Sequence, residues 1–465
     1  MIHLKNISFA YGKAYCLKEV SLKIKKGETV AIIGPSGNGK TSIIRTINGL
    51  IPHYFAEGKF EGSVYINGKD TKELSMWERG KIVGSVFQDP RTQFFSDKVE
   101  GEIAFSCENY GFDHDKIVDY TNDIIKELKL KELKGKKLSG LSSGERQKVA
   151  IASAMVAKAK ILIFDEPSAN LDDEGIENLS CILKTLKYYG TTMIFAEHRI
   201  YYLMDIVDRF LYIKDGRIIR EYTKEEIKAL GLLKQKELGI RCPFKTTIKP
   251  LQKISIKEDK KPLIEIKNIV LNIKGKNIIN NCSFLGYAGQ IIAILGSNGS
   301  GKTSLAKVIS GIYKESKGNV LIEGNKITHK KRNKKVWYGA NETQTQFFTN
   351  SIEQEILTGI NKTPELLDKA RSLLRVFDLY DIRYKHPYAL SGGQKQRLSI
   401  VCGLLSERKI LILDEPSSGL DYKNMEILAK TIKYAASLGK AIFIITHDYE
   451  LVNACCTHYY NLTGE

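Results

Sequence analysis

No stretch of the chain is apolar for as long as a lipid bilayer requires. A membrane-spanning helix needs about 18 to 20 mostly apolar residues in a row. The longest apolar runs here, TVAIIG at 29–34 and ILIFDE at 161–166, predict short buried strands. The opening stretch, MIHLKNISFAYGK, does not resemble a secretory signal, because its apolar part is short and interrupted by polar residues. We therefore expect a cytosolic protein that can dock on a membrane.

Paired cysteines and an excess of acidic residues are also missing. The eight cysteines are scattered and none forms a CxxC pair, so we expect reduced, structural thiols.

The 71 Lys and Arg residues outnumber the 53 Asp and Glu residues, which gives a formal net charge of +18. Such an excess is typical of proteins that bind nucleic acid, anionic lipid or another polyanion. It also fits lysines spread over solvated faces, and their even distribution along the chain favours that interpretation.

The chain contains two copies of one pattern. Residues 4–34 align without a gap to 266–296, and LSSGERQKVAI from 141 aligns to LSGGQKQRLSI from 390. The first copy carries an extra loop around 51–59. Internal repeats of this length predict two domains of the same fold. We place them at 1–233 and 263–465, joined by a polar, lysine-rich linker at 234–262 that runs over the surface.

Each copy alternates apolar, β-branched strands with amphipathic helices. This order predicts an α/β domain built on a largely parallel sheet.

Each copy also contains a complete phosphate-binding loop between a strand and a helix. GPSGNGKTS follows TVAII, and GSNGSGKTS follows IIAIL; both match the pattern GxxxxGK[ST]. Glycines allow backbone N–H groups to surround a phosphate chain, and the helix N-terminus adds favourable potential. The lysines should reach the β- and γ-phosphates, and the threonines after them should bind Mg²⁺. The predicted loop residues are Gly34, Pro35, Ser36, Gly37, Asn38, Gly39, Lys40, Thr41 and Ser42, with Gly296, Ser297, Asn298, Gly299, Ser300, Gly301, Lys302, Thr303 and Ser304.

Two carboxylates end a buried strand in each copy: Asp165–Glu166 after ILIF and Asp414–Glu415 after ILIL. Burying carboxylates at such a position costs free energy of folding unless they bind a cation or take part in a proton transfer. We expect Asp165 and Asp414 to hold Mg²⁺ through its water shell, and the glutamates to polarise the attacking water. A single histidine after a strand is usually only a polar strand end. Because His198 and His447 follow strands at equivalent positions, γ-phosphate contact is the better interpretation.

In this order, twice over, the motifs resemble those of the ATP-binding-cassette (ABC) ATPases. The resemblance covers essentially all of the chain except the linker. It implies two P-loop domains, each with a helical signature subdomain, that close face to face around ATP as an intramolecular pseudo-dimer. In that arrangement the signature segment of one domain faces the phosphate loop of the other. The signature residues are then Ser142, Ser143, Gly144 and Glu145, with Ser391, Gly392, Gly393 and Gln394.

The segment VFQDPRTQFFSDKVEGEIAFSCEN at 86–109 is similar to the glutamine loops of energy-coupling-factor (ECF) importers, and so are NGLIPHYF at 48–55 and AEHR at 196–199. Arg91 departs from that pattern, since many relatives have an acidic residue or asparagine there. The resemblance implies a peripheral subunit on the cytoplasmic face of the cell membrane. Its partners would be a membrane scaffold subunit and a membrane subunit that binds a vitamin, a precursor or a metal ion. No nucleic acid would be bound.

Other cassette proteins remain alternatives. Tandem sugar importers have a similar length but lack the Q-x-P-x-x-Q-F pattern. Cassette ATPases of translation would suit the basic charge, yet they usually carry a longer charged helical hairpin between their halves. DNA-repair and chromosome ATPases would need zinc modules or long coiled coils, which this sequence lacks.

The resemblance also predicts two ATP sites of unequal completeness. Site one, which contains the phosphate loop at 34–42, has Tyr11 to stack on adenine and Gln88 to couple Mg²⁺ and water to the membrane partner. At the equivalent positions of site two the chain has Ile273 and Asn341. We expect slower or weaker turnover at site two, and neutral drift at these positions is an equal alternative.

Overall fold

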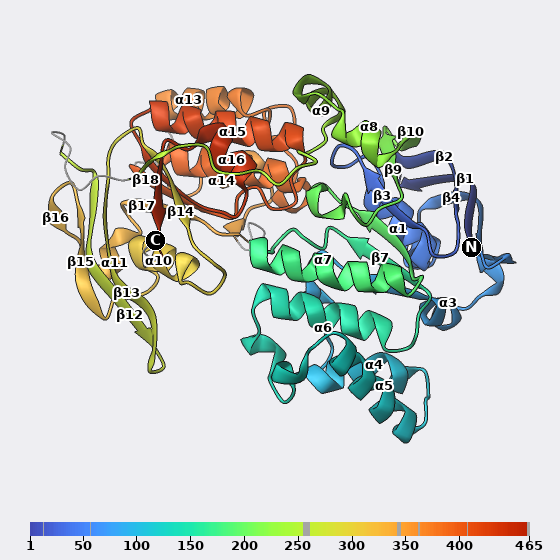
Figure 1. Ribbon diagram of the computed structural model, residues 1–465. Coiled ribbons are helices and arrows are strands. Elements are labelled where there is room, and N and C mark those ends of the chain that lie inside the picture. Colours follow the sequence, from blue (N-terminus) through green and yellow to red (C-terminus); the bar gives the residue numbers. More distant parts are fainter. Residues whose placement is uncertain are drawn as a thin grey trace. The chain divides into compact units, whose positions relative to one another are not determined.

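Two six-stranded sheets form the centres of two separate units of the chain, Met1–Lys245 and Thr246–Glu465 (Figure 1). The computed structural model describes residues 1–12, 14–55, 57–253, 261–341, 346–360, 363–406 and 408–462. Both units have the α/β P-loop architecture that the sequence predicts. The limits predicted for the domains and the linker, at 233/234 and 262/263, stay predictions.

The central sheet of the first unit is parallel except at one edge. Its strand order is β10-β9-β3-β8-β7-β6, and only β10 runs antiparallel to its neighbour. This order brings the ends of β3, β7 and β8, which precede the phosphate loop, the acidic pair and the histidine, to one edge of the sheet. The strands are β3 (Thr29–Ile33), β6 (Val83–Val86), β7 (Ile161–Asp165), β8 (Thr192–Ala196), β9 (Arg209–Lys214) and β10 (Arg217–Tyr222).

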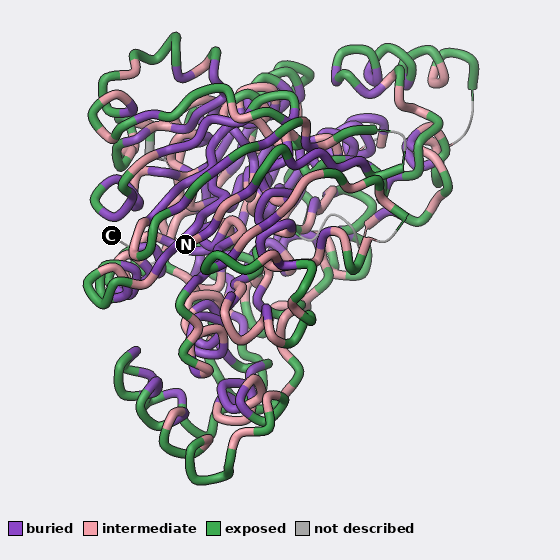
Figure 2. Tube along the Cα trace, turned by 90° about the vertical axis from the view of Figure 1, so that its right-hand side faces the viewer, coloured by how far each residue is buried: buried purple, intermediate pink, exposed green. Residues whose placement is uncertain are grey.

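Strand β7 shows why the short apolar runs form central strands. Successive side chains of a strand point to opposite faces, and in β7 both faces are covered. Ile161 and Ile163 pack in one buried cluster with the first helix and the antiparallel strands, while Leu162 and Phe164 pack in another with the later helices. Figure 2 shows buried residues gathered along the central strands. Continuous apolar runs are typical of strands buried on both faces.

A second, antiparallel sheet in each unit was not predicted. In the first unit its order is β2-β1-β4-β5, and in the second it is β13-β12-β15-β16. These strands are β1 (Ile2–Tyr11), β2 (Ala14–Ile24), β4 (Lys59–Ile66), β5 (Lys69–Asp70), β12 (Ile264–Ile273), β13 (Lys276–Gly286), β15 (Lys317–Ile322) and β16 (Asn325–Lys326). The repeat alignment of 4–34 with 266–296 covers most of β1, β2, β12 and β13, but alignment alone does not give the direction of the strands.

Helices cover the sheets of the first unit. They are α1 (Lys40–Asn48), α2 (Leu50–His53), α3 (Met76–Ile82), α4 (Val99–Asn109), α5 (His114–Glu127), α6 (Ser143–Met155), α7 (Asp173–Tyr188), α8 (Lys224–Lys228) and α9 (Leu232–Leu238).

The central sheet of the second unit has the order β11-β20-β14-β19-β18-β17, and all its pairs are parallel. Its strands are β11 (Gln252–Lys253), β14 (Ile291–Leu295), β17 (Val336–Gly339), β18 (Ile410–Asp414), β19 (Ala441–Ile445) and β20 (His458–Asn461). The helices are α10 (Lys302–Ser310), α11 (His329–Arg332), α12 (Ile352–Ile356), α13 (Pro364–Val376), α14 (Gly392–Leu405), α15 (Tyr422–Ser437) and α16 (Tyr449–Cys455).

The stretch predicted as a surface linker is more structured than its composition indicates. Helix α9 crosses its predicted start, and Leu238 and Ile240 belong to the core of the first unit. Near the other end, β11 pairs with β20 of the second unit. A few apolar residues among the lysines are enough to attach both ends to a domain. Residues 254–260 of this linker lie outside the described residues.

All eight cysteines lie in described residues and are free thiols, as expected. Across the described ranges, none of the helices is both long and apolar enough to cross a bilayer.

Candidate nucleotide-binding sites

The phosphate loop of the first unit has a backbone that only glycine adopts readily. Gly34 has φ 137° and Gly39 has φ 100°, values at which side chains are strained. A Cβ at Gly34 would lie 2.2 Å from the Ile213 carbonyl oxygen, and one at Gly39 would lie 2.6 Å from that of Cys16. Glycine is therefore required for conformation and for space, and the loop leads directly into α1.

The loop lysines lie in the centre of their own loops. Lys40 Nζ donates to the carbonyl oxygens of Gly34 and Pro35 at 2.9 and 3.0 Å. Lys302 Nζ does the same to Gly296 and Ser297 at 2.7 and 2.8 Å. Both lysines are buried. Each ammonium group is thus held beside the N-terminus of a helix, where an anionic ligand is favoured.

The predicted magnesium residues lie together in both units. Thr41 Oγ1 donates to Asp165 Oδ1 at 3.0 Å, and Thr303 Oγ1 donates to Asp414 Oδ1 at 3.3 Å. Burial raises the pKa of Asp165 and of Asp414, and the threonine hydrogen bonds act in the opposite direction. Desolvation of this kind favours a bound cation or a proton. Hydroxyl and carboxylate oxygens are the donors that Mg²⁺ prefers, so this donor set fits the ion.

A cation at these positions would need further oxygen ligands. Within the described ranges, no group of three or more His, Cys, Asp or Glu side chains could hold a metal ion. Phosphate oxygens and water are the usual additional ligands of Mg²⁺ in nucleotide sites.

The predicted catalytic glutamates occupy a strained backbone position. Glu166 has φ 45° and Glu415 has φ 46°, in the left-handed region that costs a non-glycine residue free energy. Each backbone N–H bonds to the end of the next strand at 2.8 Å, to Ala196 and Ile445 respectively. Strain of this type concentrates at functional sites. Here the left-handed conformation ends the extended backbone of the strand at the glutamate.

Gln88, Glu166 and His198 come together in the first unit. Gln88 Nε2 donates to Glu166 Oε2 at 2.9 Å, and His198 Nε2 lies 3.5 Å from Glu166 Oε1 and 3.3 Å from Ser36 Oγ. Burial, followed by the charges of Lys40 and Arg241, lowers the pKa of His198 well below its usual value. A neutral ring with one N–H can donate a single hydrogen bond at this position.

A buried carboxylate next to His198 was missed by sequence reasoning. Glu197 is 2% exposed and accepts from Ser168 Oγ at 2.9 Å and Tyr202 Oη at 2.8 Å. It also accepts from the His198 backbone N–H at 2.8 Å. These three hydrogen-bond donors satisfy the buried carboxylate of Glu197. Because one of them is the His198 backbone N–H, Glu197 positions the histidine. In the sequence, the only indication of Glu197 was the AEHR segment, which has no fixed spacing to the other motifs.

The second unit builds a related network with different partners. His447 Nε2 lies 3.7 Å from Glu415 Oε1 and 3.1 Å from Asn298 Oδ1. Thr446, at the position of Glu197, donates to Glu415 Oε2 at 3.1 Å. Asn341, which replaces Gln88, is exposed and precedes the undescribed residues 342–345.

An aromatic cluster surrounds Tyr11 in the first unit. The ring of Phe55 meets it edge-on at 5.1 Å and 87°, and Phe9 meets it at 4.8 Å and 82°. Arg45 Nη1 donates to Tyr11 Oη at 3.3 Å, and its guanidinium lies 5.4 Å from the Phe55 ring centre. The second unit has the exposed Ile273 at the equivalent position. Phe55 comes from the extra loop of the first copy, and its contact with Tyr11 was not predicted.

The two signature segments form the same capping box at the start of α6 and α14. Ser142 Oγ accepts from the Glu145 N–H at 3.2 Å, and Glu145 Oε2 accepts from the Ser142 N–H at 2.7 Å. Ser391 and Gln394 make the same pair of bonds at 3.3 and 2.9 Å. Because either side chain offers the oxygen that the cap needs, the exchange of glutamine for glutamate preserves the local structure. Glu145 also accepts from Lys136 Nζ at 3.4 Å.

The segments that follow the glutamine loops expose one phenylalanine in each unit. Phe95 is 75% exposed and Phe348 is 85% exposed. A buried glutamate fixes each backbone: Glu102 accepts from the N–H groups of Phe95 and Ser96 at 2.8 and 2.9 Å. Glu355 accepts from those of Phe348 and Thr349 at 3.0 and 2.9 Å. Arg91, the departure from the ECF pattern, forms an ion pair with Asp89 at 2.8 Å.

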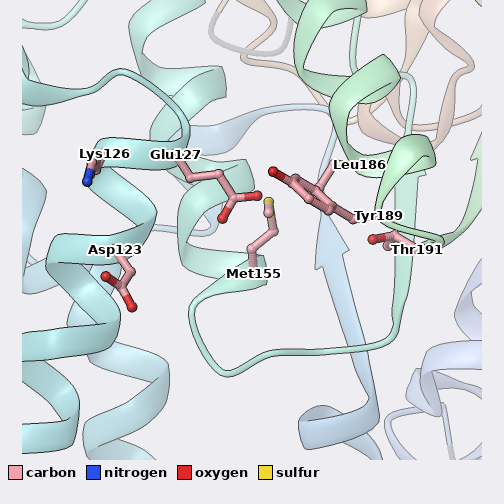
Figure 3. A pocket seen from close by; sticks show the side chains of 7 residues that line it. All are labelled: Asp123, Lys126, Glu127, Met155, Leu186, Tyr189 and Thr191. Atoms are coloured by element: carbon pink, nitrogen blue, oxygen red, sulfur yellow. The ribbon is translucent and has the colours of Figure 1, made fainter.

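A surface cavity of about 580 Å³ lies in the first unit among the ends of α5, α6 and α7. In Figure 3, Glu127 and Tyr189 point toward each other across Met155. Its lining is Asp123, Lys126, Glu127, Met155, Leu186, Tyr189 and Thr191. None of these belongs to the phosphate loop, the acidic pair or the histidine, so we assign it no part in nucleotide binding.

Comparison with known families agrees with this geometry. The family model described as "ABC transporter" matches residues 17–169 and 279–418. A second model, described as "AAA domain, putative AbiEii toxin, Type IV TA system", matches residues 385–453, a small part of the chain. The chain belongs to the ABC transporter ATP-binding family and carries two cassettes.

Relatives of full length have the same description. Two proteins of Treponema denticola, each named "Putative ABC transporter ATP-binding protein", are 37% and 35% identical to the chain. The matches cover 100% and 98% of this chain and 96% and 94% of the relatives. Among solved structures, a chain in a model of ribosome-bound archaeal Pelota and ABCE1 matches with a TM-score of 0.67. It is 22% identical and covers 98% of this chain and 76% of that one, which supports the fold alone.

Proposed function

We propose that the chain hydrolyses ATP to power an importer of the ECF type, through separate membrane subunits. The solute would be a vitamin, a vitamin precursor or a metal ion. Support comes from the resemblance of residues 86–109 to the glutamine loops of such importers, and from the aromatic side chains that this segment exposes.

In the proposed hydrolysis, the chain's own groups bind the nucleotide and move one proton. Lys40 contacts the β- and γ-phosphates in place of its present carbonyl partners, and His198 donates its N–H to the γ-phosphate. Glu166 accepts a hydrogen bond, and then a proton, from the attacking water at its carboxylate. Gln88 orients Glu166 through the bond at 2.9 Å. A bound Mg²⁺, held by Thr41 and through water by Asp165, would neutralise phosphate charge.

The second unit has the equivalent groups Lys302, Thr303, Asp414, Glu415 and His447 at comparable distances. We propose that it also hydrolyses ATP, at a lower rate. Ile273 provides no ring for the adenine, and Asn341 has an amide arm one methylene shorter than glutamine.

The observation that carries the proposed partner is the repeated exposed phenylalanine. Phe95 and Phe348 lie at equivalent positions of the two units and are 75% and 85% exposed, and the ring of Phe95 stacks on that of Phe105 with centroids 4.9 Å apart. Glu102 and Glu355 hold the backbone of Phe95 and Phe348 through buried carboxylate bonds. Fixing a contact residue before binding reduces the entropy lost on association. A hydrophobic helix end of a membrane scaffold is the partner that suits this pair.

The test is affinity purification of the full chain from its own cells in mild detergent, followed by identification of the bound proteins. We expect a membrane scaffold subunit and a small membrane subunit to remain bound. The double variant Phe95→Ala with Phe348→Ala should lose both. As a matched control, Tyr188→Ala removes an equally exposed ring on α7 and should retain them.

Recovery of ribosomal proteins alone would contradict the proposal and favour a translation ATPase. Recovery of a sugar permease would contradict the ECF assignment and leave the transport ATPase.

A further inference from the structure

Asp414, the predicted metal-site carboxylate of the second unit, accepts a hydrogen bond from Tyr338. Among the described residues, Asp165 of the first unit has no equivalent hydrogen bond from its neighbouring strand. Tyr338 Oη donates to Asp414 Oδ2 at 2.9 Å, while Thr303 Oγ1 donates to Oδ1 at 3.3 Å. Both carboxylate oxygens are therefore engaged by hydroxyl groups. Tyr338 belongs to no nucleotide-binding motif, and it lies 76 residues before Asp414.

Strand register explains how the phenol reaches the metal site. Strand β17 lies beside β18 in parallel, with Tyr338 opposite Ile412 (Figure 1). In the first unit, β6 pairs with β7 in the same way, and Ser85 lies opposite Ile163. The Ser85 hydroxyl instead accepts from Asn48 Nδ2 at 3.2 Å. The same strand position thus carries a long donor in one unit and a short side chain with another partner in the other.

The position of Tyr338 is fixed from its backbone as well. Gln346 Nε2 donates to the Tyr338 carbonyl oxygen at 2.8 Å, and Gln346 Oε1 accepts from Ser399 Oγ on α14 at 3.3 Å. In the first unit Gln93 has a different partner, since its Oε1 accepts from the Phe87 N–H at 3.1 Å. Because the backbone of Tyr338 is held by Gln346, its hydroxyl should keep pointing at Asp414 when that carboxylate also interacts with a cation.

We propose that Tyr338 is a positioning residue that weakens the hold of the second site on the divalent cation of a bound nucleotide. This inference rests on the proposed ATPase function. A carboxylate that binds Mg²⁺ through water must accept hydrogen bonds from metal-bound water. Tyr338 occupies a lone pair on Oδ2 and withdraws charge from the carboxylate, so less remains for the hydrated ion. Thr303 differs because its hydroxyl would itself be a ligand of the bound ion.

The test measures metal affinity directly, in the full chain. A Lys40→Ala background restricts nucleotide binding to the second phosphate loop, and Mn²⁺ binding in the presence of a non-hydrolysable ATP analogue is followed by electron paramagnetic resonance. Tyr338→Phe keeps the ring and removes only the hydroxyl. We expect it to bind Mn²⁺ about three- to tenfold more tightly, the range that the net contribution of one hydrogen bond supports. Affinity for the analogue in EDTA should not change.

Tyr313→Phe is the matched control, because it removes the hydroxyl of another half-buried tyrosine of the same unit, and it should leave the Mn²⁺ affinity unchanged. Equal or weaker Mn²⁺ binding by Tyr338→Phe, or the same gain in Tyr313→Phe, would overturn the role of Tyr338 alone. Absence of analogue-dependent Mn²⁺ binding in the Lys40→Ala chain itself would overturn the proposed ATP site together with it.

Discussion

Glu166 and Glu415 share one backbone strain but have different neighbours. Gln88 orients Glu166 directly, whereas Glu415 accepts from Thr446 and the His447 N–H. A general base is effective only when its lone pair is aimed at the water. The two glutamates should therefore make unequal contributions to total turnover.

The first prediction compares Glu166→Gln with Glu415→Gln in steady-state ATPase assays. Loss of a general base reduces its own site by about 10²- to 10⁴-fold, so the total rate falls to that of the remaining site. We expect Glu166→Gln to remove most of the activity and Glu415→Gln to remove the smaller share. Equal losses in both variants would contradict the unequal sites.

The second prediction concerns the ring that supports Tyr11. Phe55 meets Tyr11 edge-on at 5.1 Å, and aromatic pairs of this kind contribute about 0.5–1.5 kcal/mol. Phe55→Ala should leave Tyr11 less well positioned for adenine and raise the ATP KM of the first site by about two- to tenfold. A Lys302→Ala background isolates that site. Tyr15→Ala removes an exposed ring that contacts Lys59 and should keep the KM; a KM unaffected by Phe55→Ala would contradict the supporting role.

At this scale the motifs anticipated which of the proposed site residues lie together, but not their further partners. The loop, acidic-pair and histidine positions are set by motifs with fixed spacing. The bond between Thr41 and Asp165 joins residues 124 positions apart, and it could be anticipated because both belong to motifs. Tyr338 belongs to no motif, and the segments that contain Phe55 and Glu197 have no fixed spacing to the other motifs, so only the folded strand register and loop path reveal what these three residues contact.

Among the elements, helix α6 shows how a sequence difference can leave structure unchanged. Its capping box uses Glu145 where α14 uses Gln394. The two signature segments differ at two positions, LSSGE against LSGGQ. The hydrogen bonds show that both side chains perform the same local role, and a carboxylate is also favoured at a helix N-terminus.

The third prediction separates the cap from the charge. Glu145→Gln should change the free energy of unfolding by less than about 0.5 kcal/mol, because glutamine closes the same box. Glu145→Ala removes one half of the box and should cost about 1 kcal/mol. Urea unfolding followed by circular dichroism measures both. If glutamine and alanine destabilise equally, the charge and its contact with Lys136 matter more than the cap.

The elements were predicted unevenly for a physical reason. The central strands are continuous apolar runs that only a buried position explains, so β3, β7, β14 and β18 coincide with the predicted strands. The antiparallel strands are half-exposed and carry many polar residues, so their pairing depends on contacts distant in sequence. Within the predicted linker, the lysines concealed the few apolar side chains, such as Leu238 and Ile240, that pack against a unit.

At the scale of the whole molecule, each buried cluster formed by the described residues belongs to one unit. Two clusters lie within Met1–Lys245 and two within Thr246–Glu465. Each unit also has its own phosphate loop and acidic pair. Separate cores and separate ligand sites mean that a nucleotide should stabilise the unit that binds it.

The last prediction uses differential scanning calorimetry of the full chain with and without an ATP analogue and Mg²⁺. A ligand at 100 times its Kd adds about 2.7 kcal/mol to the folded state, which raises the unfolding temperature of a unit of this size by roughly 5–10 °C. Lys40→Ala should abolish the shift of one transition and Lys302→Ala that of the other. Because the second unit has Ile273 in place of Tyr11 and its Asp414 carboxylate accepts from Tyr338, the shift lost in Lys302→Ala should be the smaller. A single transition that both variants affect equally would mean that the two units unfold as one cooperative body, and the separate cores would then not govern the stability of the chain.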